Sequence, residues 1–344
     1  MTTNNIEPIT TAQIPAYVSD AHALRLPLFI WGSPGVGKSA AVAQAADHLD
    51  LGFIDIRLSQ IDSVDLRGLP HVDRDTNRSR YALPDVLPFA ERDGKNGILF
   101  LDEMNLASAA TQSAAYQLIH DRKLGDYVLP DGWTVIAAGN DRSHRVHATK
   151  MSSALANRFT HLWATTDLDG WSKWAARAGI ADIIRAFVRN RPELLNTFDP
   201  AREETAFATP RSWEKVSKIL QSVPRERQWP LIAGSVGAGP AGEFVAFERI
   251  ASRMPNPDAV LMDPDGAKLP RLEDENGPAL LYALAAAISS RATRNSIDRV
   301  VKVVNRMPVE FGVVTMKEAL TREPALAATG AAVDWLAENG DVLI

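Results

Sequence analysis

The chain contains no cysteine and no excess of positive charge, and each absence removes some classes of protein. Without cysteine it has no disulfides, no thiolate zinc sites and no thiol nucleophile. Lys and Arg total 37 against 42 Asp and Glu, so the formal net charge is −5 and no global basic field attracts a nucleic-acid backbone. These totals weigh against nucleic-acid binding, although they allow a local basic patch.

Long hydrophobic runs and a leader pattern are also missing. The first residues, Met1–Asn5, lack the basic and then apolar run of a signal peptide. The longest strictly apolar run, Ala279–Ile288, is far shorter than a membrane span. The seven histidines show no metal-ligand spacing. We therefore expect a cytoplasmic protein without membrane contact and without a histidine metal centre.

The arrangement of apolar runs predicts two domains in the 344 residues. Up to about residue 165, short apolar runs alternate with helical stretches, which predicts an α/β fold whose parallel sheet is covered on both faces. The expected strands are 28–31, 53–58, 98–101, 134–138 and 161–164, and the expected helices between them are 39–49 and 108–120. After residue 165 we expect helices only, at 180–190, 212–220, 242–252, 278–290 and 296–307, with a loop at 254–270.

A phosphate-binding loop follows the first expected strand. Gly32-Ser33-Pro34-Gly35-Val36-Gly37-Lys38-Ser39 matches G-x-x-x-x-G-K-[ST], with an apolar strand before it and a helix after it. The Lys38 ammonium would lie between the β- and γ-phosphates of a nucleotide, and the Ser39 hydroxyl would ligate Mg²⁺. The residues expected around the phosphates are Gly35, Val36, Gly37, Lys38, Ser39 and Ala40. The alternative is a glycine-rich turn beside a surface lysine.

Two further strands end in polar side chains. The run Ile98–Leu101 ends in Asp102 and Glu103, at the strand end where open α/β sheets bind ligands. Asp102 would hold Mg²⁺, and Glu103 would orient and deprotonate the attacking water. The run Thr134–Gly139 ends in Asn140, which could bond that water and a γ-phosphate oxygen, or could simply be a turn residue.

These three segments resemble the Walker A, Walker B and sensor 1 motifs of AAA+ ATPases. The resemblance implies a P-loop AAA+ core with a parallel five-stranded sheet flanked by helices over 1–165, connecting helices over 166–205, and an α-helical lid with a C-terminal extension over 206–344. It also implies ATP and Mg²⁺ as ligands and hydrolysis of ATP to ADP and phosphate.

Two arginines fit further positions of the same family. The segment Ala154–Phe159 resembles the end of the helix that carries the arginine finger, which makes Arg158 the candidate. The segment Ala208–Trp213 resembles sensor 2, in which Pro210 opens a lid helix and Arg211 points to the phosphates. A surface arginine and a helix-start arginine are the alternatives. A finger arginine acts on a neighbouring subunit, so the resemblance implies a ring of identical chains, by analogy a hexamer.

Two insertions narrow the resemblance to the MoxR-like ATPases of the helix-2-insert clade. Residues 65–81 resemble the helix-2 insert, and 122–131, with Gly125-Asp126 as a hairpin turn, resemble the pre-sensor-1 hairpin. MoxR relatives often carry Asn-Pro at sensor 1 and Asp-Arg-Phe at the finger, where this chain has Asn140-Asp141 and Asn157-Arg158. The resemblance implies a chaperone-like role on a protein client, with a von Willebrand factor A domain as a possible partner.

Two other functions remain open on the sequence. A nucleic-acid motor or loader would need a basic stripe, whereas residues 61–95 mix aspartates with arginines. A nucleotide-dependent structural ring would not need Glu103 and Arg158. The G-x-G-x-x-G run at Gly237–Gly242 is not followed by a strand, so it predicts a helix start and not a dinucleotide site.

Overall fold

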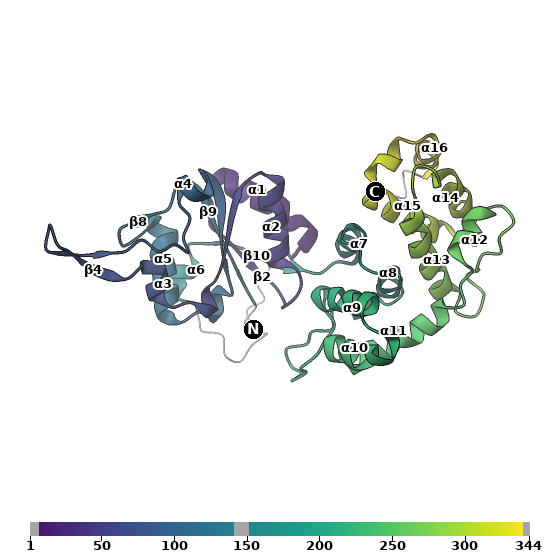
Figure 1. Cartoon of the computed structure of the whole chain (residues 1–344), viewed down its shortest axis with the longest axis horizontal. Helices are drawn as coiled ribbons and strands as arrows, with labels where there is room; N and C mark the ends of the chain where they lie inside the picture. Colours follow the sequence, from purple (N-terminus) through teal and green to yellow (C-terminus); the bar gives the residue numbers. More distant parts are fainter. Residues whose placement is uncertain (1–6, 141–150, 340–344) are drawn as a thin grey trace. The chain divides into compact units, whose positions relative to one another are not determined.

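The computed structural model describes residues 7–140 and 151–339 (Figure 1). The chain divides into two compact units. The first comprises residues 1–167 and 199–202, and the second comprises 168–198 and 203–344. Each unit has its own apolar cores.

The first unit is built on a parallel sheet in the order β1-β10-β2-β9-β6-β3. Its strands are β1 (Ile9–Thr10), β2 (Leu28–Trp31), β3 (Gly52–Arg57), β6 (Asn96–Asp102), β9 (Gly132–Gly139) and β10 (Thr160–Thr165). The predicted AAA+ fold with a parallel sheet and a helical C-terminal region is confirmed. The count of five strands was wrong by one, because the two-residue β1 pairs at the edge of β10 and is too short to give a sequence pattern.

Alternation along the strands explains the two covering layers. In β2, Leu28 and Ile30 face one core, formed with α1 (Ile14–Leu24) and α2 (Lys38–His48). Phe29 faces the opposite core, formed with α3 (Ser63–Arg67), α5 (Ala109–Asp121) and α6 (Ser153–Ala156). Both faces are apolar, which is why these strands read as continuous runs.

Two hairpins extend from the first unit where the insertions were expected. One joins β4 (Pro70–Asp73) to β5 (Arg78–Tyr81), and Figure 1 shows it projecting from the body of the unit. The other joins β7 (Lys123–Leu124) to β8 (Tyr127–Val128) through Gly125, whose φ of +61° suits a tight turn. The Tyr81 backbone N–H donates to the Asp126 carboxylate at 3.2 Å, so the hairpins touch. The short α4 (Ala90–Asp93) leads into β6.

Among the described residues of the second unit, helices are the only regular secondary structure. Its helices are α7 (Leu168–Arg177), α8 (Asp182–Asn190), α9 (Pro210–Ser222), α10 (Gln228–Val236), α11 (Ala238–Ala251), α12 (Pro257–Met262), α13 (Gly277–Arg291), α14 (Ile297–Val304), α15 (Val309–Arg322) and α16 (Gly330–Asn339). In this unit α7 and α8, the expected connecting helices, share a core with α9, α10 and α11. Within the described residues, no helix is long and apolar enough to cross a membrane.

Two sequence expectations for this unit need correction. The stretch 254–270 is not all loop, because Asn256 caps a short helix whose first residue is Pro257, a favoured start. The helix expected from residue 242 begins at Ala238, inside the glycine run, with Gly237 at φ +88° before it.

A buried ionic network connects α8 to α15. The Glu318 carboxylate is 3% exposed and accepts hydrogen bonds from Arg185, from Arg189 Nε at 3.0 Å and from Ser289 Oγ at 3.1 Å. Arg185 is 2% exposed and also donates to Asp182 at 2.9 Å. Burying these charges is tolerable only because each is paired and hydrogen-bonded.

Replacing Glu318 with Leu is expected to destabilise the helical unit by about 3–5 kcal/mol, because buried Arg185 would lose one of its two carboxylate partners and Arg189 would lose its bond to Glu318. Urea unfolding followed by tryptophan fluorescence measures this. Lys218→Ala, which breaks the exposed pair with Glu214 in the same unit, is the control and should cost at most about 1 kcal/mol. A Glu318→Leu cost as small as the control's would contradict the prediction.

Candidate functional site

The phosphate-binding loop connects β2 to α2. Gly35 and Gly37 have φ angles of +76° and +103°, a left-handed conformation in which a side chain would be strained. The helix begins at Lys38, so the N–H groups of its first turn open toward the loop and form a ready site for an anion. Gly32 has no room for a Cβ, which would lie 2.7 Å from the Ala164 carbonyl oxygen. The loop thus has the backbone geometry of a phosphate cradle.

The Lys38 ammonium lies inside this loop. It is 8% exposed and donates to the carbonyl oxygens of Gly32 at 2.8 Å and Ser33 at 3.0 Å. It also donates to Asn140 Oδ1 at 3.3 Å. The contact joins residues 102 positions apart, because β9 pairs directly with β2.

The end of β6 meets the first turn of α2. The Ser39 hydroxyl donates to Asp102 Oδ2 at 2.9 Å, which places a hydroxyl and a carboxylate side by side. Burial, reinforced by the nearby Asp102 carboxylate, raises the pKa of Asp55 above its ordinary value, and the Arg57 guanidinium opposes that shift. The two carboxyl groups therefore repel each other when charged, and a cation beside Asp102 would relieve that repulsion.

The residues at this edge fit a magnesium ion carried by a nucleotide. Mg²⁺ takes oxygen ligands and is usually held by one or two carboxylates together with substrate phosphates and water. Ser39 and Asp102 supply such oxygens. Among residues 7–140 and 151–339, no three His, Cys, Asp or Glu side chains gather as a metal centre. A Mg²⁺ ion here would take its other ligands from the nucleotide phosphates and water.

Glu103 has a strained backbone and a partner that the sequence did not indicate. Its φ is +54°, and its N–H donates to Asp102 Oδ1 at 2.8 Å. The Ser59 hydroxyl donates to Glu103 Oε2. Ser59 follows β3, 44 residues earlier in the chain, and nothing in its local sequence distinguishes it from a loop serine.

Asn105 is a second residue that the sequence reasoning missed. Its side chain is 3% exposed, donates to the Asn140 carbonyl at 2.7 Å and accepts from the Asn140 N–H at 3.3 Å. Gly139 also faces it, since a Cβ there would lie 2.5 Å from Asn105 Oδ1. This pair of bonds fixes the backbone of Asn140 where its side chain meets Lys38. The sequence feature that could have pointed to Asn105 is its place as a polar residue between the apolar residues Met104 and Leu106.

Arg158 lies away from the phosphate loop of its own chain. It stands two residues before β10, and Thr160 pairs with Leu28 at the amino end of β2, whereas the loop follows the carboxyl end of β2. Its guanidinium lies 5.8 Å from the Tyr116 ring centroid and donates to the Tyr116 hydroxyl at 3.3 Å. The structure therefore does not group Arg158 with Lys38, Ser39, Asp102 and Asn140.

Arg211 belongs to the helical unit. It is the second residue of α9, is exposed, and follows Pro210 and the capping residue Thr209. Because it lies in the other unit, its action on the phosphates stays a prediction.

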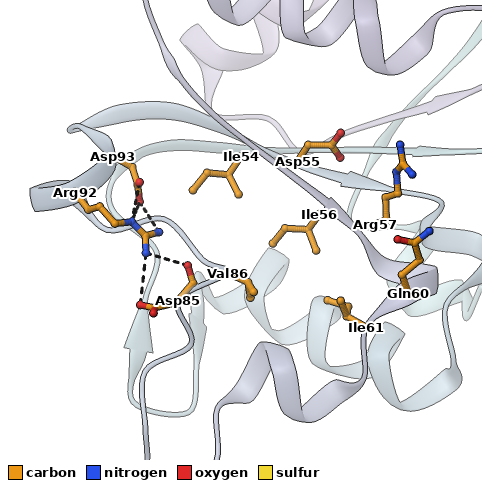
Figure 2. A pocket seen from close by; sticks show the side chains of 10 residues that line it. All are labelled: Ile54, Asp55, Ile56, Arg57, Gln60, Ile61, Asp85, Val86, Arg92 and Asp93. Atoms are coloured by element: carbon orange, nitrogen blue, oxygen red, sulfur yellow. Dashed lines mark hydrogen bonds and ion pairs between the residues drawn. The ribbon is translucent and has the colours of Figure 1, made fainter.

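A cavity of about 590 Å³ lies beside the edge strand β3 (Figure 2). Ile54 and Ile56 line one side, and Arg92 bonds to Asp93 at 2.8 Å and to Asp85 at 3.5 Å on the other. Neither Lys38 nor Asp102 lines it. The phosphate site is thus defined by loop geometry and not by this cavity.

Comparison with known proteins agrees with the geometry. Residues 27–159 match the family model described as "AAA domain (dynein-related subfamily)". Midasin of Giardia intestinalis is 26% identical over 170 residues, which is 47% of this chain but only 3% of midasin.

Solved structures give weaker likenesses. NtrX of Brucella abortus in complex with ATP has 13% identity and a TM-score of 0.40, covering 98% of this chain and 69% of that chain. The RuvB Holliday junction branch migration motor of Thermotoga maritima has 15% identity and a TM-score of 0.38, covering 81% and 80%. The parallel sheet, the phosphate-binding loop and the family match together give residues 27–159 the P-loop AAA+ fold.

Proposed function

We propose that the chain is an ATP-hydrolysing remodelling ATPase of MoxR type that works as a ring on a protein client. The observation that supports hydrolysis most strongly is the convergence of Lys38, Ser39, Asp102 and Asn140 at the carboxyl edge of one sheet. These residues come from the loop after β2 and from the ends of β6 and β9.

The residues divide the work of hydrolysis. Lys38 and the loop N–H groups bind the phosphates, and Mg²⁺ held beside Ser39 and Asp102 would neutralise charge on the β- and γ-oxygens. Glu103 takes a proton from water while the water oxygen bonds to the γ-phosphorus. The bond from that phosphorus to the β–γ bridging oxygen breaks, which releases ADP and phosphate. Ser59 holds one Glu103 oxygen, and Asn105 holds Asn140 in place to orient the water.

Lys38→Ala is expected to lose ATP binding, because the cation opposite the phosphates disappears. Glu103→Gln is expected to bind ATP and leave it unhydrolysed, because the amide keeps the shape and loses the base. Nucleotide affinity and phosphate release on the purified variants measure both effects. His71→Ala, on an exposed strand of the projecting hairpin, is the control. Turnover in Glu103→Gln equal to that of the unmodified chain would remove Glu103 as the base.

The position of Arg158 supports action in trans. Because it lies at the amino end of β2, opposite the loop, its side chain is better placed for the nucleotide of a neighbouring chain than for its own. Arginine fingers contribute about 10³–10⁵-fold in rate. We therefore propose a ring, a hexamer by resemblance, whose active sites lie between subunits, with Arg211 as a further contact to the phosphates.

ATP·Mg²⁺ is expected to promote assembly of Glu103→Gln, because the γ-phosphate gives Arg158 of the neighbour an anion to bind. Sedimentation with and without nucleotide measures this, and the double variant Glu103→Gln, Arg158→Ala should assemble less. A chain that stays monomeric in saturating ATP would contradict the ring.

The projecting hairpin supports a protein client. Leu69, at the base of the hairpin, is 67% exposed, and Val72, within β4, is 63% exposed; exposed apolar side chains on a projecting hairpin are typical of protein contacts. Arginines and aspartates are mixed there, and Arg80 pairs with Asp73 at 3.3 Å, so the charge of the hairpin is not of one sign and does not favour nucleic acid over protein. Packing of Leu69 against a neighbouring subunit is the second candidate role. We also propose a partner with a von Willebrand factor A domain, and this part of the proposal rests only on the resemblance to the MoxR-like ATPases.

Leu69→Ser, or deletion of residues 72–78, is expected to leave basal ATP turnover within about a few-fold, because neither contacts the phosphate loop. Some proteins are expected to co-purify with Glu103→Gln only when ATP is present. They should no longer co-purify when Leu69→Ser or the deletion is added to Glu103→Gln. Met262→Ser, 80% exposed on the helical unit, is the control. Loss of assembly in Leu69→Ser would instead indicate subunit packing. Tight, salt-sensitive DNA binding would contradict the protein client.

A further inference from the structure

A histidine that no motif includes bridges the phosphate-loop strand to the Arg158 segment. His161 lies on β10, paired with Phe29 of β2. Its Nδ1 accepts a hydrogen bond from Trp31 Nε1 at 2.9 Å, and its Nε2 contacts the Ala156 carbonyl oxygen at 2.8 Å. Trp31 is the residue directly before Gly32 of the loop, and Ala156 is two residues before Arg158.

The two partners determine the protonation state of the ring. An indole N–H can only donate, so Nδ1 must be the acceptor. A carbonyl oxygen can only accept, so Nε2 must carry the proton and donate it. His161 is therefore held as the neutral Nε2–H tautomer, with both nitrogens satisfied. Phenylalanine or leucine would fill the same space between the neighbouring rings of Phe29 and Phe159 but could make neither bond.

The Arg158 segment needs such an anchor. Helix α6 has only four residues, Ser153–Ala156, and a helix of one turn is unstable without tertiary contacts. Its carboxyl end leaves carbonyl groups without helical donors. The Ala156 carbonyl accepts from Phe159 N at 3.2 Å and from His161, so the ring fixes the turn that carries Arg158.

We propose that His161 is a positioning residue for Arg158, which it fixes through Ala156 against the strand that carries the phosphate loop. The proposal rests on the trans role proposed for Arg158. His161 touches neither substrate nor metal, so its effect passes through Arg158. A change at His161 should therefore alter the rate of ATP turnover in the assembled ring and not the affinity for nucleotide. A displacement of about 1 Å in a catalytic group can cost about 10²-fold in rate.

The test measures kcat and KM for ATP on the full-length chain carrying His161→Phe, alone and combined with Arg158→Ala. His161→Phe is expected to lower kcat about 10- to 100-fold, with KM within about threefold. Added to Arg158→Ala, it should lower kcat no further. Trp31→Phe, which removes only the indole donor, should give a smaller loss of the same kind.

Three further comparisons separate positioning from packing. Trp163→Phe is the matched control, because Trp163 contacts His161 as an aromatic neighbour, with 6.1 Å between the ring centroids, and the kcat of this variant should not change. His161→Gln keeps an amide donor for the Ala156 carbonyl and should recover most of the activity. If His161→Phe does not fold, Trp31→Phe and His161→Gln carry the test.

The outcomes are distinguishable. An equal loss from His161→Phe with and without Arg158→Ala, or an equal loss in Trp163→Phe, would overturn the positioning role while leaving the ATPase intact. An unchanged kcat in His161→Phe would also overturn it. An unchanged kcat in Arg158→Ala alone would overturn the proposed trans role of Arg158, and the positioning role would fall with it.

Discussion

The chemistry of this chain depends on one geometric constraint, that the carboxyl ends of adjacent parallel strands meet at the same edge of the sheet. The order β2-β9-β6 brings the loop after β2, Asn140 after β9 and Asp102 at the end of β6 into contact. The bonds from Lys38 to Asn140 and from Ser39 to Asp102 show that the contact is made by side chains. The apolar interior of each strand keeps this edge rigid.

A second layer of polar residues holds the first in place. Asn105 fixes the backbone of Asn140, Ser59 holds Glu103, and His161 joins β2 to the turn before Arg158. Each of these bonds is at least partly removed from water or lies beside a charged group, where its direction matters most. The helical unit is stabilised by its own cores and by the network around Glu318.

The sequence predicted what is local and missed what is distant. The phosphate loop and the acidic end of β6 are contiguous motifs flanked by apolar strands, so their place in the fold could be read directly. Asn105, Ser59 and His161 act on partners 35, 44 and 130 residues away, and only the sheet order brings them together. Helix α10 was missed because Pro230 and Gly234 interrupt its pattern, although Pro230 lies in its first turn, where proline is tolerated. Charge and composition alone could not predict the buried role of Arg185.

The central claim is that a nucleotide is bound and cleaved where Lys38, Ser39, Asp102 and Asn140 meet. The most direct measurement is an experimental structure of Glu103→Gln with ATP and Mg²⁺. The account predicts that Lys38 and Asn140 contact the γ-phosphate, that the metal lies beside Ser39 and Asp102, and that Arg158 of a neighbouring chain approaches the same phosphate. A nucleotide bound elsewhere, or a γ-phosphate without contact to Lys38, would contradict it.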